Sequence, residues 1–269
     1  MADRDWLKLA VVEFLGPFAL VFVGVGAVIQ TQGQNLVAIA LAHGLAIGVL
    51  FAAVGHISGG AFNPAVTLGL LVARRIDGVR AAVYVVAQLL GGLVAAGLLT
   101  LVYPDLGVFG RNTFAVNLGV PGIGDAFTTG NAVAAEIVLT FLLMIVFFGV
   151  AIDHRTGRAI SGLVIGLAYT VAILAGGAVS GAFLNPARAF GPAVVQGEFA
   201  DHWVWWVGPA IGAAVAALLY NELLLADEPA ATEARPRVDP DLPDQALDPL
   251  SVVGPAAATR SRRSQRRRR

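Results

Sequence analysis

Six apolar runs of about 20 residues each, separated by short polar segments, divide this chain. A helix needs about 20 mostly apolar residues to cross the hydrocarbon core of a bilayer. The pattern therefore predicts transmembrane helices over roughly residues 9–29, 36–56, 81–103, 131–152, 159–179 and 203–225.

Two shorter apolar segments interrupt this pattern: 63–73 follows the second run and 185–195 follows the fifth. As a helix, each would extend about 16 Å, which is half the thickness of a membrane. Each begins with Asn-Pro, and proline is favoured in the first turn of a helix because it lacks the N–H that would be unpaired there. The sequence therefore predicts two half-helices that enter the membrane without crossing it.

The half-helices belong to an internal repeat. SGGAFNPAVTLG begins at Ser58 and SGAFLNPARAFG begins at Ser180, so the two segments align without gaps at an offset of 122 residues (180 − 58). The tripeptide at Gly44–Ala46 recurs at the same offset, at Gly166–Ala168. A repeat at a fixed offset indicates a repeated structural unit.

Each copy contains three predicted crossings, so the repeat halves are about 9–103 and 131–225. An odd number of crossings inverts the second copy, and inverted repeats with discontinuous helices are typical of transport proteins. The predicted fold is an all-α membrane protein with six transmembrane helices and two re-entrant half-helices. Together they form a channel domain over residues 1–225.

Composition agrees with a membrane protein, because 57% of the residues are hydrophobic and only 13% are charged. The chain has no cysteine, which excludes disulfides, thiol nucleophiles and Cys-ligated metal sites. The sequence shows no catalytic nucleophile, metal-ligand cluster or phosphate-binding loop. We therefore expect a protein that is not an enzyme and that uses no cofactor or metal.

The formal net charge is zero, but the basic residues near the predicted crossings fall on one side of the membrane. The opposite loops hold Arg111 alone. The positive-inside rule then predicts a multi-pass protein of the cell (inner) membrane with both termini in the cytoplasm. The residues on the basic side are Arg4, Lys8, Arg74, Arg75, Arg80, Arg155 and Arg158.

Residues 226–269 differ from the rest of the chain: they are rich in proline and acidic residues and end in RSRRSQRRRR. We expect a disordered cytoplasmic tail. Its basic end is interpreted as a solvated terminus that reinforces topology, with attraction to anionic lipid of the bilayer as the alternative. No nucleic-acid partner is expected.

The two Asn-Pro-Ala motifs, Asn63-Pro64-Ala65 and Asn185-Pro186-Ala187, carry the chemistry of the predicted membrane interior. A helix N-terminus has about half a positive charge. Two such ends facing each other would oppose cations, including protons. Each Asn amide would also offer N–H donors to a passing oxygen, and so orient a water molecule and interrupt a proton-conducting wire.

These paired motifs resemble those of aquaporins in the major intrinsic protein family, and the resemblance covers about residues 6–225. It implies six tilted helices, two re-entrant half-helices and a homotetramer with one pore in each subunit. Selectivity in such pores comes from diameter, lining groups, an arginine and half-helix dipoles.

The resemblance also implies an outer selectivity filter. Arg188 directly follows the second motif, and the family pattern adds His43, Ile173 and Ala182. This set is similar to that of plant tonoplast intrinsic proteins, and it leaves a wider filter than a strict water channel has. A structural salt bridge for Arg188 and a hydrogen-bonded core role for His43 are the alternatives.

Glu13 and Glu136 are carboxylates inside predicted spans, 50 and 49 residues before Asn63 and Asn185. They would either relay protons, as in a secondary transporter, or accept hydrogen bonds from backbone N–H groups of the re-entrant loops. The second interpretation leaves the loop carbonyls free to line the pore. Those carbonyls belong to Gly59, Gly60, Ala61, Phe62, Gly181, Ala182, Phe183 and Leu184.

The sequence thus predicts a passive channel for water with a smaller flux of glycerol, urea or ammonia. Ala189, Ala193 and Trp205-Trp206 depart from the pattern of the family's glycerol facilitators. A proton-coupled transporter using Glu13 and Glu136 is the alternative, and a closed junction protein is a third possibility. Whether His56 or His154 gates the pore by pH is left open.

Overall fold

The computed structural model describes residues 3–103, 121–153, 155 and 158–225. Within these ranges the regular structure is entirely helical, and six helices are long and apolar enough to cross a membrane. The predicted six-span fold is confirmed. The long helices are α1 (Asp3–Thr31), α2 (Leu36–Ser58), α4 (Gly78–Val102), α5 (Thr129–Phe147), α6 (Ser161–Ser180) and α8 (Val204–Leu219). Arg111, His154 and the predicted tail lie outside the described residues.

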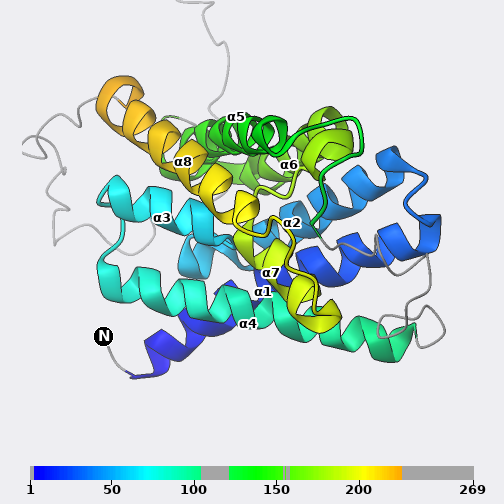
Figure 1. Cartoon of the computed structure of the whole chain (residues 1–269). Helices are drawn as coiled ribbons and strands as arrows, with labels where there is room; N and C mark the ends of the chain where they lie inside the picture. Colours follow the sequence, from blue (N-terminus) through cyan, green and yellow to red (C-terminus); the bar gives the residue numbers. More distant parts are fainter. Residues whose placement is uncertain (1–2, 104–120, 154, 156–157, 226–269) are drawn as a thin grey trace, which may run out of the picture. The chain divides into compact units, whose positions relative to one another are not determined.

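The two predicted half-helices are present as α3 (Pro64–Val72) and α7 (Pro186–Gln196). α3 lies between α4 and α8 (Figure 1), and each half-helix contacts a long helix of the other half: α3 packs against α8, and α7 packs against α4. The half-helices are therefore enclosed by the long helices, as the polar Asn at each N-terminus requires in an apolar medium.

Two equivalent glycines turn the chain from a long helix into each re-entrant loop. Gly59 ends α2 with φ 96° and Gly181 ends α6 with φ 78°, and both conformations are left-handed. Glycine adopts this region without the steric penalty of a side chain. The positions are 122 residues apart (181 − 59), which is the offset of the sequence repeat.

Small residues bring α2 and α6 into close contact. A Cβ atom added to Gly48 would lie 2.8 Å from the carbonyl oxygen of Gly162, and one on Gly166 would lie 3.0 Å from Gly48 Cα. Glycines at such crossings let transmembrane helices approach backbone to backbone. The crossing holds α2, which carries His43, against α6, which carries Ile173.

Polarity is distributed in the opposite sense to a soluble protein. Large apolar side chains are exposed on the long helices, for example Leu101, Val171 and Leu163 at 73%, 63% and 56%. Glu13 and Arg188 are buried, with exposed fractions of 0% and 5%. An apolar exterior suits a lipid bilayer, because lipid tails offer no hydrogen-bond partner.

α5 and α8 do not continue as regular α-helices over their full predicted spans. Each ends in a π-helical turn, η3 (Phe148–Ile152) after α5 and η5 (Tyr220–Leu224) after α8. A single 3₁₀ turn, η4 (Arg158–Ile160), precedes α6. The two π turns contact each other through the rings of Phe148 and Tyr220, whose centroids are 5.6 Å apart.

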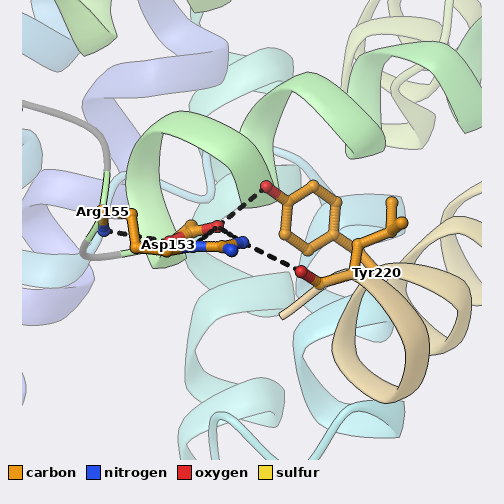
Figure 2. Close-up of polar contacts among 4 residues, drawn as sticks. Asp153, Arg155 and Tyr220 are labelled. Carbon is orange, nitrogen blue, oxygen red and sulfur yellow. Dashed lines mark hydrogen bonds and ion pairs between the residues drawn. The ribbon is translucent and has the colours of Figure 1, made fainter. Parts of the chain in front are cut away.

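Asp153 joins these two helix ends (Figure 2). Its carboxylate accepts hydrogen bonds from Arg155 Nε at 2.9 Å and Nη2 at 2.5 Å, and from the Tyr220 hydroxyl at 3.1 Å. Arg155 Nη2 also donates to the Leu224 carbonyl at 2.9 Å. The hydrogen bonds from Arg155 hold the pKa of Asp153 well below its ordinary range.

We expect Asp153→Asn to loosen this contact and to speed tryptic cleavage after Arg155 by at least about threefold in detergent-solubilised protein. A lowered carboxyl pKa means that the contact is intact at neutral pH. It is lost only as the pH falls through that lowered value. Asp5→Asn is the matched control, because Asp5 pairs with Lys8 on the surface at 3.7 Å. Equal cleavage rates in the two variants would contradict the prediction.

Candidate functional site at the paired Asn-Pro-Ala turns

The two Asn-Pro-Ala turns meet inside the protein, each at the first turn of a half-helix. Asn63 and Asn185 have extended backbones, and their Oδ1 atoms accept hydrogen bonds from the backbone N–H groups of Ala65 at 2.8 Å and Ala187 at 3.0 Å. Each Oδ1 thus caps its own helix. Each Nδ2, the donor end of the amide, is directed away from that helix.

The Nδ2 atoms tie the two halves of the protein to each other. Asn63 Nδ2 donates to the Leu184 carbonyl at 2.8 Å, and Asn185 Nδ2 donates to the Phe62 carbonyl at 2.9 Å. Phe62 and Leu184 each immediately precede the Asn of their own half, so the exchange is reciprocal. It holds the N-termini of α3 and α7 next to each other.

Two buried carboxylates hold the loops before these turns. Glu13 accepts hydrogen bonds from the N–H groups of Ala61 at 3.2 Å and Phe62 at 2.8 Å. Glu136 accepts the equivalent bonds from Phe183 at 2.8 Å and Leu184 at 2.7 Å. Phe62 and Leu184 have left-handed backbones, with φ 51° and 58°, which are unfavourable for residues with a Cβ. The carboxylates stabilise these conformations.

The hydrogen bonds that hold the two carboxylates in place are also repeated in both halves. Ser58 Oγ donates to the carboxylate of its half at 2.6 Å, and Ser180 Oγ does so at 2.7 Å. The carbonyls of these serines accept hydrogen bonds from the Tyr84 hydroxyl at 2.5 Å and from Trp205 Nε1 at 2.9 Å. The internal repeat therefore extends to side-chain contacts.

Arg188 is held by backbone carbonyls. Its Nη1 donates to Ala182 O at 2.7 Å and Phe183 O at 3.2 Å, and its Nη2 lies 3.5 Å from Gly181 O. The guanidinium lies over the Phe183 ring, 4.2 Å from its centroid. Among the described residues no carboxylate lies within ion-pair distance of Arg188, and its buried Nε has no protein acceptor.

Several of the eight loop carbonyls predicted to line the pore also accept hydrogen bonds from protein side chains. Phe62 and Leu184 accept from the Asn side chains, and Ala182 and Phe183 accept from Arg188. The reason is that the Asn amides and the guanidinium need acceptors in a region without bulk water. Each carbonyl oxygen has a second lone pair, so it can still accept a bond from a permeating molecule.

The four predicted filter residues come from four different segments. His43 is on α2 and Ile173 on α6, whereas Ala182 lies in the second loop and Arg188 in α7. Ala182 and Arg188 are in direct contact. Ile173 belongs to the same buried cluster as Ala182. His43 Nδ1 is 2.8 Å from the Ile39 carbonyl, so this contact leaves Nε2 as the other ring nitrogen.

Tyr169 adds a contact that the motifs do not predict. Its hydroxyl oxygen accepts a hydrogen bond from Asn63 Nδ2 at 3.0 Å. Asn63 Nδ2 therefore has two protein acceptors, Tyr169 and Leu184, for its two N–H groups. The expectation that each Asn offers a donor to a passing oxygen is wrong for Asn63.

Comparison with known proteins agrees with this architecture. A family profile described as "Major intrinsic protein" matches residues 1–220. The chain belongs to the major intrinsic protein family. Among its relatives is aquaporin TIP4-4 of Zea mays, 42% identical over 89% of this chain and 95% of that protein. Human aquaporin-5 is 43% identical over 81% of this chain and 82% of its own length.

A solved structure is also similar, the aquaglyceroporin from Plasmodium falciparum. Its TM-score is 0.74 over 81% of this chain and 97% of that chain, and at 24% identity the likeness supports the fold alone. Aquaporins of this family are membrane channels and not enzymes. The protein is accordingly a multi-pass membrane channel of the aquaporin family.

In this aquaporin-family channel, a comparison of the two repeat halves shows that Tyr169 differs from its counterpart in the first half. The matched tripeptides Gly44–Ala46 and Gly166–Ala168 are followed by Ile47 in the first half and by Tyr169 in the second. The repeat therefore changes from an aliphatic to a phenolic side chain at equivalent positions. The two halves therefore differ in chemistry at the position that follows the matched tripeptide.

A cavity of about 480 Å³ is lined by residues of α2, of the first loop and of the segments around η3 and the start of α6. Its lining includes Ser58 and Gly59 of the first loop, together with His56, Arg75 and Arg80. His56, one of the two histidines considered for gating, thus borders this cavity. The other, His154, is outside the described residues.

Proposed function

We propose that the protein is a passive channel for water that excludes protons and ions. The proposal rests on the reciprocal hydrogen bonds that hold the N-termini of α3 and α7 together. Each N-terminus has about half a positive charge, and the Arg188 guanidinium adds a full charge with no carboxylate at ion-pair distance among the described residues. Together these charges oppose the entry of cations.

The outer filter of the proposed channel consists of His43, Ile173, Ala182 and Arg188. Ala182 contributes only a methyl group and its carbonyl, and Ile173 contributes no hydrogen-bond donor. Such a filter has more room and fewer donors than one lined by an aromatic residue and a second histidine. We propose that small neutral solutes such as glycerol, urea or ammonia pass it more slowly than water.

Glu13 and Glu136 have a structural role in this proposal. Both are fully buried, and each of their hydrogen-bond partners among the described residues is a donor on the loop of their own half or on a neighbouring helix. A carboxylate that must release its proton during a transport cycle would have to give up these bonds. This supports a passive channel over a proton-coupled transporter.

The wider organisation is proposed from the same features. Residues 1–225 form the channel domain, with halves at about 9–103 and 131–225, and the compact unit that contains them ends at residue 226. We propose a homotetramer in the lipid bilayer of the cell membrane, with both termini and the 226–269 tail in the cytoplasm and without a nucleic-acid partner. The apolar exterior of the long helices supports contact with lipid.

The deciding experiment is osmotic shrinkage of proteoliposomes followed by stopped-flow light scattering. We expect water permeability well above that of empty vesicles, without saturation and without dependence on a pH gradient. Shrinkage no faster than in empty vesicles would contradict the channel and favour a closed junction protein. Saturable flux that depends on a pH gradient would favour a transporter.

A further inference from the structure

Tyr169 lies at the meeting point of the two Asn-Pro-Ala turns. Its side chain is almost fully buried, with an exposed fraction of 3%, and its hydroxyl oxygen is 3.0 Å from Asn63 Nδ2. A phenol oxygen thus occupies a position at which the Asn63 amide would otherwise donate to a permeating water molecule.

The surrounding helices place Tyr169 one turn from the proposed outer filter. Tyr169 and Ile173 are four residues apart on α6, and His43 and Ile47 have the same spacing on α2. Residues at this spacing lie on the same face of a helix, about 5–6 Å apart. Ile47 therefore lies on the same face of α2 as the filter residue His43, and Tyr169 lies on the same face of α6 as the filter residue Ile173.

We propose that Tyr169 is a specificity-determining residue that forms a second constriction of the channel at the Asn-Pro-Ala turns. This inference rests on the proposed channel function. It assigns the final rejection of larger neutral solutes to Tyr169 rather than to the outer filter, whose Ile173 and Ala182 leave room.

The chemistry of a phenol explains how water could pass where larger solutes do not. The hydroxyl accepts from Asn63 and keeps one O–H with which to donate. A water molecule can exchange hydrogen bonds with such a group one at a time. Glycerol and urea must also pass the aromatic ring, which is larger than the Ile47 side chain at the equivalent position of the first half.

The first test replaces the ring. Tyr169→Ile gives the second half the side chain that Ile47 provides in the first. We expect the ratio of glycerol to water permeability in proteoliposomes to rise at least about threefold, because pore diameter sets the size limit. Urea should follow glycerol in the same direction.

The second test removes the hydroxyl and keeps the ring. Tyr169→Phe frees one N–H of Asn63 for water, so water permeability should rise by about twofold or more, within the range expected for one hydrogen bond. The glycerol-to-water ratio should stay at or below the wild-type value. Tyr103→Phe is the matched control, because it removes a phenolic hydroxyl that pairs with Gln30 at an exposed position.

These outcomes separate this inference from the proposed function. If the wild-type protein conducts water but both Tyr169 variants match it in water permeability and in the glycerol ratio, the constriction is elsewhere and the inference is overturned. If the wild-type protein itself conducts no water, the proposed function fails first. Should Tyr169→Ile not fold, Tyr169→Phe still decides, because an unchanged water permeability in it overturns the role of the hydroxyl.

Discussion

Proteoliposomes that carry Arg188→Val should leak protons at least about tenfold faster than those with the wild-type protein, a change in barrier of about 1.4 kcal/mol. The substitution removes a buried positive charge that has no carboxylate partner among the described residues. It also leaves the carbonyl oxygens of Ala182 and Phe183 without their guanidinium donor. Carbonyl oxygens attract cations, so both changes lower the barrier in the same direction.

The leak is measured with a pH-sensitive dye inside the vesicles after an external acid pulse. Arg188→Lys separates charge from shape, because Lys keeps the positive charge but lacks the planar fork that contacts several carbonyls. We expect it to leak less than Arg188→Val. Arg74→Gln is the control for loss of an exposed arginine. A leak in Arg188→Val equal to that in Arg74→Gln would show that the filter lies elsewhere.

The helical framework was predictable because its signals are local. An apolar run of sufficient length indicates a crossing, and Asn followed by Pro indicates a helix start, so α3 and α7 begin at Pro64 and Pro186 as expected. The π turns at the ends of α5 and α8 were not predictable. They depend on contact between Phe148 and Tyr220, which are 72 residues apart in the chain (220 − 148).

The sequence predicted only those parts of the candidate site that occur in both repeat halves. The nearly equal spacing of Glu13 and Glu136 from their motifs, 50 and 49 residues, indicated carboxylates that support the loops, and both contact the expected backbone N–H groups. The cross-bonds between halves and the role of Tyr169 are tertiary contacts. Asn63 and Tyr169 are 106 residues apart, and no local pattern specifies that an amide will meet a phenol.

Glu136→Gln should destabilise the protein strongly. Glu136 Oε1 accepts from Ser180 Oγ and from the N–H of Phe183, and Oε2 accepts from the N–H of Leu184. A Gln side chain places an NH₂ group against one of these N–H donors in either orientation. One buried N–H then loses its acceptor and meets another donor, which costs about 3 kcal/mol.

This cost corresponds to an apparent melting temperature roughly 6–12 °C lower for a protein of this size. It can be measured in detergent by loss of the monodisperse peak on size exclusion after heating. Thr140→Val is a matched control on the same helix, one turn from Glu136. Thr140 Oγ1 is buried with no hydrogen-bond partner among the described residues, so its replacement by valine should leave the melting temperature unchanged or raise it.

Glu136→Gln and Glu13→Gln together distinguish structural carboxylates from carboxylates that relay protons. Gln88 Nε2 donates to Glu13 at 2.7 Å, and within the part of the chain that the structure describes no side-chain amide donates to Glu136. Gln88 can reverse its amide and accept from a glutamine at position 13, so Glu13→Gln should cost less stability than Glu136→Gln. In both variants the water flux per folded channel should stay near wild type and independent of a pH gradient. A variant that folds as stably as wild type but loses pH-coupled flux would show instead that these carboxylates carry protons.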